Sequence, residues 1–289
     1  MDRLVSIPPK EVFQNRQLVM RQMAENIGIG FPRSFDRSSN PVHDFHTNDA
    51  EIKSAWRKAN RLLKEQKIED DTIRIGLIVG TGAWQTILPE LEPHIDMLLF
   101  VDNNPSMSEW VRYTQGALKQ CQTREEYRRS VYEDLRSPWQ DATFREYGMR
   151  RAEEDHMGDK HFLYSDANYE KSRNTYLQAL ASGKAMMPVY IDLADPIQLK
   201  RLGNTIGSRG KVTYANFTNV AEHIADVGMQ DGNAVSMATT TYPASLRVLP
   251  FHDNVVVQYS KSTIRDGPVM LGITAKVATQ LDDYFGNAA

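Results

Sequence analysis

Two glycines and an acid have the types and the spacing that hold a nucleoside. The segment Gly80-Thr81-Gly82 supplies two positions where the backbone can turn tightly or approach a ligand, because glycine has no Cβ. Asp102 follows Gly82 by about 20 residues, the spacing at which an acid lies beside such a turn and accepts hydrogen bonds from two ribose hydroxyls. We therefore expect these residues to form one nucleoside site.

Two apolar segments must position this turn and this acid. Residues 73–79 (IRIGLIV) form a nearly continuous apolar run, which is typical of a parallel strand buried on both faces. Residues 97–101 (MLLFV) form a second such strand, and it ends at Asp102. Residues 83–91 between them predict a helix, which Pro89 keeps short.

Position 85 bears on which nucleoside is bound. A dinucleotide fingerprint places Gly or Ala there, because helix and strand pack closely beside a pyrophosphate. This chain has Gln85 instead. A cofactor without a pyrophosphate therefore fits the turn better than NAD does.

The pattern resembles the first motif of class I S-adenosylmethionine-dependent methyltransferases. The resemblance implies that Gly80, Thr81 and Gly82 form the cofactor turn and that Asp102 binds the ribose. The continuation Asp102-Asn103-Asn104-Pro105 is similar to the D-x-N-P that follows the second strand in that superfamily, which adds Asn103 to the expected cofactor contacts.

A third apolar segment, residues 186–191, is followed by Asp192 and Leu193. The resemblance implies that Asp192 accepts a hydrogen bond from the adenine amino group and that Leu193 packs on the ring. Asp195 precedes Pro196 and a helical pattern over 196–206, so it is the expected N-cap of that helix. A capping role stays open for Asp192 as well.

Residues 210–224 (GKVTYANFTNVAEHI) predict a fourth strand, a polar turn and a helix. In class I methyltransferases, the residues just after this strand lie beside the transferable group. The resemblance therefore makes Asn216 both a cofactor contact and the candidate catalytic residue. Thr218 or Asn219 can cap the following helix.

The whole chain predicts an α/β fold, a Rossmann-like, mostly parallel seven-stranded sheet flanked by helices. Residues 1–70 are expected to form an N-terminal helical lid or flank, and residues 71–289 the cofactor-binding domain. Residues 106–184 form a helical insertion between the second and third strands, far longer than one crossover helix needs. Its last helical pattern ends on Gly183 as a C-cap. Its aromatic residues, including Phe162 and Tyr164, either line an acceptor pocket or form an added core.

The last third of the chain predicts further strands. Residues 234–241 form one of them, and residues 254–262 and 267–275 form two later strands, expected to be antiparallel closers of the sheet.

Composition excludes several classes of protein. The net charge of -3 gives no support for nonspecific nucleic-acid binding. The single Cys121 cannot form an internal disulfide, which suits a reducing compartment. The polar run 43–49 (HDFHTND) has metal-ligand types without a defined spacing, so no metal site is expected. No segment reaches the length of a membrane span and no signal peptide is visible, so we expect a cytoplasmic protein, with signal-less secretion left open.

These expectations converge on an S-adenosylmethionine-dependent transferase, most simply a methyltransferase. Its acceptor, a small molecule or a protein, is not identified by the sequence, and transfer of an aminocarboxypropyl group stays open. An NAD(P)-dependent oxidoreductase and a catalytically silent scaffold that binds a protein partner are the alternatives. The sequence does not indicate the oligomeric state.

Overall fold

The structure is a computed structural model of the 289-residue chain. It describes eight ranges of the chain, and every structural statement below concerns these: 9–31, 52–69, 71–80, 84–103, 105–133, 158–217, 245–263 and 272–278.

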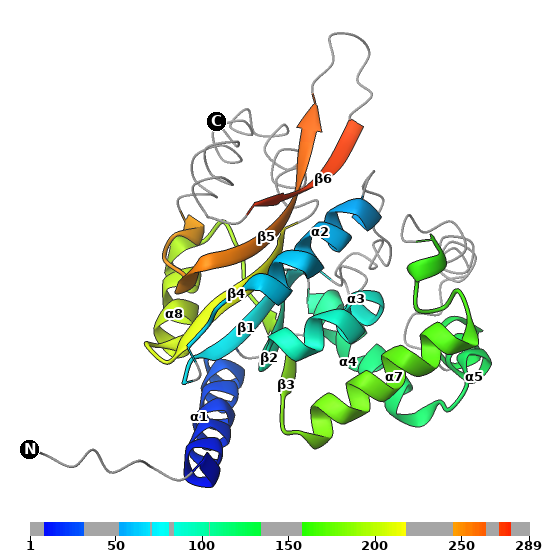
Figure 1. The fold of residues 1–289 in the computed structure, drawn as a ribbon, viewed down its shortest axis with the longest axis horizontal. Coiled ribbons are helices and arrows are strands. Elements are labelled where there is room, and N and C mark those ends of the chain that lie inside the picture. The colour runs from blue at the N-terminus through cyan, green and yellow to red at the C-terminus, as the bar shows by residue number, and fades with distance from the viewer. Residues whose placement is uncertain are drawn as a thin grey trace, which may run out of the picture.

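Six strands form one mixed, mostly parallel sheet (Figure 1). Their order is β3-β2-β1-β4-β5-β6, and every neighbouring pair is parallel except β5 and β6. This order is that of a Rossmann-like sheet, so the expected fold class is confirmed. The strands are β1 (Ile73–Val79), β2 (Met97–Asp102), β3 (Ala185–Tyr190), β4 (Gly210–Phe217), β5 (Phe251–Thr263) and β6 (Gly272–Ala278).

The last strands differ from the sequence prediction. We expected two antiparallel closing strands, but β5 runs parallel to β4, with Ala215 opposite Val257, and only β6 is antiparallel. The connections explain the difference, because residues 218–250 are long enough for the crossover that a parallel strand requires, whereas residues 264–271 are not. The structure shows six strands in the described ranges, and the expected strand at 234–241 lies outside them.

Helices cover both faces of the sheet (Figure 1). One face packs against α1 (Pro9–Gly30) and α8 (Pro196–Ile206), with Ile27 and Leu202 buried beside Leu77 of β1. The other face packs against α2 (Ile52–Glu65), α3 (Trp84–Leu91) and α4 (Pro105–Gln120). Burial on both faces explains why the strands read as continuous apolar runs. The two N-terminal helices thus flank opposite faces of the sheet, whereas the domain boundary near residue 70 stays a prediction.

The expected insertion between β2 and β3 is helical where the structure describes it. After α4 come α5 (Arg124–Arg128), which continues as a π-helical turn η2 (Arg129–Glu133), a short turn η3 (Gly158–Lys160) and α7 (Asp166–Ala181). The helix α7 ends as the sequence predicted, on Gly183 with a φ of +81°. The amide of Gly183 donates to the carbonyl of Leu180 and the amide of Lys184 to that of Ala179, which closes a Schellman motif.

Aromatic side chains join the insertion to the sheet domain. The ring of Trp84 on α3 lies 5.8 Å from that of Tyr176 on α7. Within the insertion, the ring of Tyr127 lies 5.5 Å from that of Phe162. Phe162 is 4% exposed, so it belongs to an added core and does not line an acceptor pocket. Tyr164, in contrast, is exposed to solvent. The insertion therefore extends the core over α3.

Two expectations from composition concern the described ranges. Cys121 is buried at the end of α4, and burial raises the pKa of its thiol, which is typical of a packed cysteine. Among the described helices, none is long and apolar enough to cross a membrane. The polar run at 43–49 lies outside the described residues.

Candidate functional site

The candidate site lies at the carboxyl ends of the parallel strands. Because β1, β2, β3 and β4 run in one direction, their carboxyl ends meet at one edge of the sheet (Figure 1). The chain leaves β1 towards β2 and β3 on one side and returns to β4 on the other, so the strand order reverses between β1 and β4. Open α/β sheets bind ligands in the crevice outside such a switch point.

The glycine turn begins at this edge as expected. Gly80 has a φ of +66°, a left-handed backbone conformation that is unfavourable for residues with a Cβ. Its amide donates to the carbonyl of Val101 on β2, at 3.1 Å. A Cβ built on Gly80 would lie 3.6 Å from Oδ2 of Asp102 and 3.4 Å from Cε of Met107. The structure therefore brings the first turn glycine and the expected ribose acid together.

Asp102 is held by the strand that it ends. It lies opposite Tyr190 in the β2 and β3 pairing, and its carbonyl accepts from the amide of Ile191 at 3.0 Å. The residue is half-buried, whereas the following Asn103 is exposed. Thr81 and Gly82 lie outside the described residues, so the rest of the cofactor turn stays a prediction.

The segment after β3 forms a turn and a helix start. Oδ1 of Asp195 accepts from the amides of Ile197 at 2.8 Å and Gln198 at 3.3 Å, so the predicted N-cap of α8 is confirmed, with Pro196 in the first helical position. The cap lowers the pKa of the Asp195 carboxyl, chiefly through the side-chain hydrogen bond from Gln198.

Asp192 and Leu193 occupy this same turn. Oδ1 of Asp192 accepts from the amide of Ala194 at 2.8 Å, which fixes the carboxylate at the carboxyl edge of β3. Leu193 is 6% exposed and packs in the core on the α1 and α8 face. Their expected contacts with adenine stay predictions.

Asn216 lies in a buried polar group near the carboxyl end of β4, which is an inner strand of the sheet. It is 4% exposed and lies opposite Ile78 of β1 and Gln258 of β5. The hydroxyl of Tyr214 donates to Oε1 of Gln258 at 3.3 Å. Burial raises the pKa of the Tyr214 phenol, and a side-chain hydrogen bond with Asn216 opposes that rise. This group is not evident from the sequence, because Tyr214 and Asn216 lie on β4 and Gln258 lies on β5. The catalytic role of Asn216 stays a prediction.

Gln85, at the position where a dinucleotide fingerprint has its third small residue, turns towards the insertion. It is buried, and its Nε2 donates to the hydroxyl of Tyr127 on α5 at 3.5 Å. Burial raises the pKa of the Tyr127 phenol, so that hydroxyl stays protonated. The Gln85 side chain thus links the start of α3 to the added helices by a hydrogen bond. A dinucleotide-binding turn has Gly or Ala at this position and could not make this contact.

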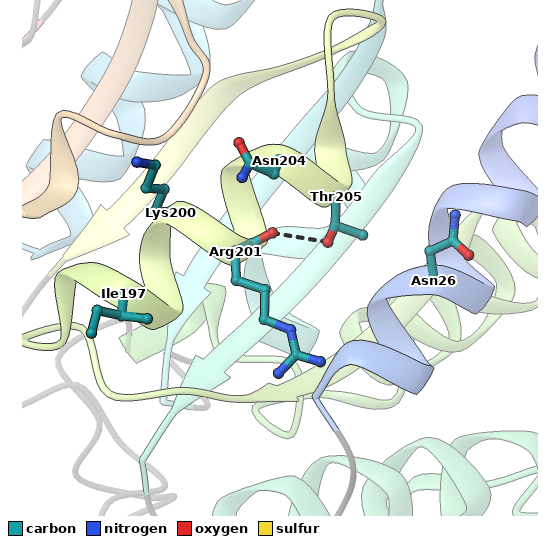
Figure 2. A pocket seen from close by; sticks show the side chains of 6 residues that line it. All are labelled: Asn26, Ile197, Lys200, Arg201, Asn204 and Thr205. Atoms are coloured by element: carbon teal, nitrogen blue, oxygen red, sulfur yellow. Dashed lines mark hydrogen bonds between the residues drawn. The ribbon is translucent and has the colours of Figure 1, made fainter.

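A large open cleft lies elsewhere, between α1 and the outer face of α8 (Figure 2). Its volume is about 500 Å³, and none of the residues expected to bind the cofactor lines it. Arg201 extends from α8 towards α1, where its guanidinium lies 5.5 Å from the ring centre of Phe31. The residues lining the cleft are Asn26, Ile197, Lys200, Arg201, Asn204 and Thr205.

Comparisons with known proteins do not assign the chain to a family. No model of a known protein family matches it, and no curated protein matches it either. What the structure establishes is therefore the Rossmann-like fold and the meeting of Gly80 and Asp102 at its switch point.

Proposed function

We propose that this chain is a class I S-adenosylmethionine-dependent transferase, in the simplest case a methyltransferase. One observation carries the proposal: Gly80 has a left-handed backbone, and the Asp102 carboxylate lies 3.6 Å from where its Cβ would be, at the carboxyl edge of the sheet. A nucleoside site in this fold needs an uncrowded backbone next to an acid for the ribose. Both features support a cofactor of the adenosylmethionine type.

The expected residues then divide the cofactor among four strand ends. The turn after β1 binds the amino acid end, the end of β2 the ribose, the turn after β3 the adenine, and the end of β4 the region next to the acceptor. In that order the residues are Gly80, Thr81 and Gly82; Asp102 and Asn103; Asp192 and Leu193; and Asn216.

The cofactor, when bound, supplies an electrophilic carbon that the sulfonium has already activated. The task of the protein is therefore to hold the acceptor nucleophile in line with that carbon and to exclude water. Asn216 is suited to orienting the acceptor, since an amide can donate and accept hydrogen bonds but does not titrate. No general base is needed where the acceptor is already nucleophilic. Which group is transferred, methyl or aminocarboxypropyl, depends on which carbon of the sulfonium faces the acceptor.

A titration of the full chain tests the proposal. S-adenosylhomocysteine, S-adenosylmethionine and NADH are titrated separately by calorimetry, followed by mass analysis of candidate acceptors incubated with adenosylmethionine. We expect both adenosyl compounds to bind one site and NADH not to bind. Tight NADH binding without adenosyl binding would establish the oxidoreductase alternative. Failure of all three ligands, with tight association to a protein partner, would establish the scaffold.

A further inference from the structure

A second, smaller cavity lies between α2, α3 and α7, on the side of the sheet that α3 covers. Its volume is about 100 Å³, well above the ~10–15 Å³ that one water molecule needs. Four basic side chains from three separate elements line this basic pocket. They are Lys53 and Arg57 from α2, Lys160 from η3 and Lys171 from α7.

The charges around the basic pocket do not balance. Lys53 forms an ion pair with Asp159, and its hydrogen bond is the main reason why the pKa of the Asp159 carboxyl is lowered. The charges of Lys160 and Arg57 lower that pKa further. Within the ranges that the structure describes, Arg57, Lys160 and Lys171 form no ion pair. The excess of positive charge favours an anion.

One acid lines the basic pocket as well, and it is already engaged. Oε2 of Glu90 accepts from Nε1 of Trp56 at 2.7 Å and from Nδ2 of Asn60 at 2.9 Å. These two hydrogen bonds hold the carboxylate against α2. Four cations against Glu90 and Asp159 still leave the pocket positive.

Two hydroxyl groups line the pocket between these cations. Ser172 on α7 is 2% exposed, and among the described residues its hydroxyl has no hydrogen-bond partner. This hydroxyl lines the pocket and can donate a hydrogen bond to an anion there. Oγ1 of Thr86 accepts from the amide of Phe162 at 3.2 Å, which leaves the proton of its hydroxyl for another acceptor.

We propose that the basic pocket binds the phosphate group of a small phosphate ester. Arg57 can donate two parallel hydrogen bonds to phosphate oxygens, Lys171 adds a point charge, and Ser172 donates from the buried wall. The volume admits a phosphate group and leaves the rest of the molecule outside. Binding of adenosylmethionine is not required, so this site and the cofactor site are tested separately.

The test titrates the full chain at constant ionic strength with inorganic phosphate, glycerol 3-phosphate and glycerol. We expect saturable one-site binding of glycerol 3-phosphate and no binding of glycerol. Affinity should rise between pH 5 and pH 8, because a phosphate monoester loses its second proton near pH 6. Binding of inorganic phosphate alone would overturn the assignment to an ester, and absence of saturable binding would overturn the site.

Substitutions separate this site from general surface charge. Arg57→Gln and Lys171→Gln should each weaken glycerol 3-phosphate binding by about threefold to tenfold, as expected for charge contacts of exposed side chains. Ser172→Ala should weaken it by about threefold. The matched control is Lys67→Gln, an exposed lysine just beyond the other end of α2, which should leave the affinity unchanged. An equal loss in the control would mean nonspecific attraction and would overturn the proposal.

A gain of affinity gives the sharpest outcome, because a folding defect cannot imitate it. Asp159→Asn removes the carboxylate that pairs with Lys53 and leaves that ammonium group for the phosphate. We expect glycerol 3-phosphate to bind about threefold more tightly to this variant. Unchanged or weaker binding would contradict a phosphate site at Lys53.

Discussion

The two edges of the parallel sheet use charged residues in opposite ways. At the amino edge, Asp96 lies between Arg74 and Arg16, whose guanidinium nitrogens lie 3.1 Å and 2.5 Å from its carboxylate oxygens. At the carboxyl edge, Asp102 lies beside Gly80, which has no side chain and a left-handed backbone. The first arrangement ties α1 to the sheet, whereas the second leaves backbone uncovered by a side chain. The amino edge therefore stabilises the fold, whereas the carboxyl edge is where the proposed cofactor site lies.

The amino edge is a stabilising structure for a physical reason. Burial alone would raise the pKa of the Asp96 carboxyl, but the hydrogen bonds and charges of Arg74 and Arg16 outweigh it and lower that pKa. The amide of Arg74 also donates to Oδ2 of Asp96 at 2.7 Å. Nearby, Nζ of Lys184 lies 2.7 Å from Oε1 of Glu92. The carboxylates of Asp96 and Glu92 are thus each compensated by a cation at this edge.

The largest effect is expected from Asp96→Ala. The change leaves two guanidinium groups and a backbone amide without their acceptor, and removing one partner of a buried pair costs about 3–5 kcal/mol. Because both arginine side chains are about a quarter exposed, we expect a loss of about 2–4 kcal/mol in the free energy of unfolding, measured with urea. Adenosylhomocysteine affinity should not change at temperatures where the variant is folded. A selective loss of affinity would mean that the two edges are coupled.

Asp102→Ala is the matching change at the carboxyl edge. Hydrogen bonds to a charged group contribute about 1.5–3 kcal/mol, so adenosylhomocysteine should bind more weakly by about that free energy in calorimetry. The free energy of unfolding should change far less than in Asp96→Ala. Unchanged affinity in a folded variant would remove Asp102 from the site.

Two glycines allow the two edges to be compared by substitutions that remove no charged group. Gly80 and Gly207 both have a φ of +66°, but Gly207 ends α8 near the amino edge, before β4. Alanine disfavours a positive φ at a cost of about 1–2 kcal/mol, so both Gly80→Ala and Gly207→Ala should lower the unfolding free energy. The loss should be at least as large at Gly207, whose ψ of -164° lies in a region that is essentially restricted to glycine. Only Gly80→Ala should also weaken adenosylhomocysteine binding. Equal affinity in the two variants would make the turn at Gly80 purely structural.

The sequence predicted the parts of the fold that local physics decides. Pro89 limits α3 to 8 residues, Asp195 and Pro196 start α8, and Gly183 ends α7, each because of the conformations that these residues favour. The spacing between the glycine turn and Asp102 also predicted that Gly80 and Asp102 lie side by side, because one short helix connects β1 to β2.

Contacts between distant segments could not be predicted. The direction of β5 depends on a long connection, and no local signal in residues 254–262 distinguishes a parallel from an antiparallel strand. The basic pocket joins Lys53 to Lys171, which are brought together only when α2 and α7 both pack against α3. The basic character of α2 was visible in the sequence, but its partners in the pocket were not.

The smallest expected effect is on the unfolding free energy at low pH, and it again contrasts a buried carboxylate with an exposed one. The folded pKa of Asp96 lies below its unfolded value of about 3.9, so its contribution to stability is present above about pH 4 and is lost as the pH falls through the folded pKa. The unfolding free energy of the parent should therefore fall more steeply below pH 4 than that of Asp96→Asn, which lacks this titration.

Asp159 provides the matched comparison for this acid effect, since the hydrogen bond from Lys53 lowers its pKa in the same direction. Its carboxylate is exposed, so salt screens its ion pair far more than the one at Asp96. The measurement is urea unfolding of the parent and both variants at pH 3, 5 and 7, in low salt and in 1 M salt. The pH dependence of the unfolding free energy should differ between the parent and Asp96→Asn in both salt conditions. Between the parent and Asp159→Asn, it should differ only in low salt. If the two variants responded to salt alike, the amino edge would be no better shielded than the surface, and its contrast with the carboxyl edge would rest on the glycine turn alone.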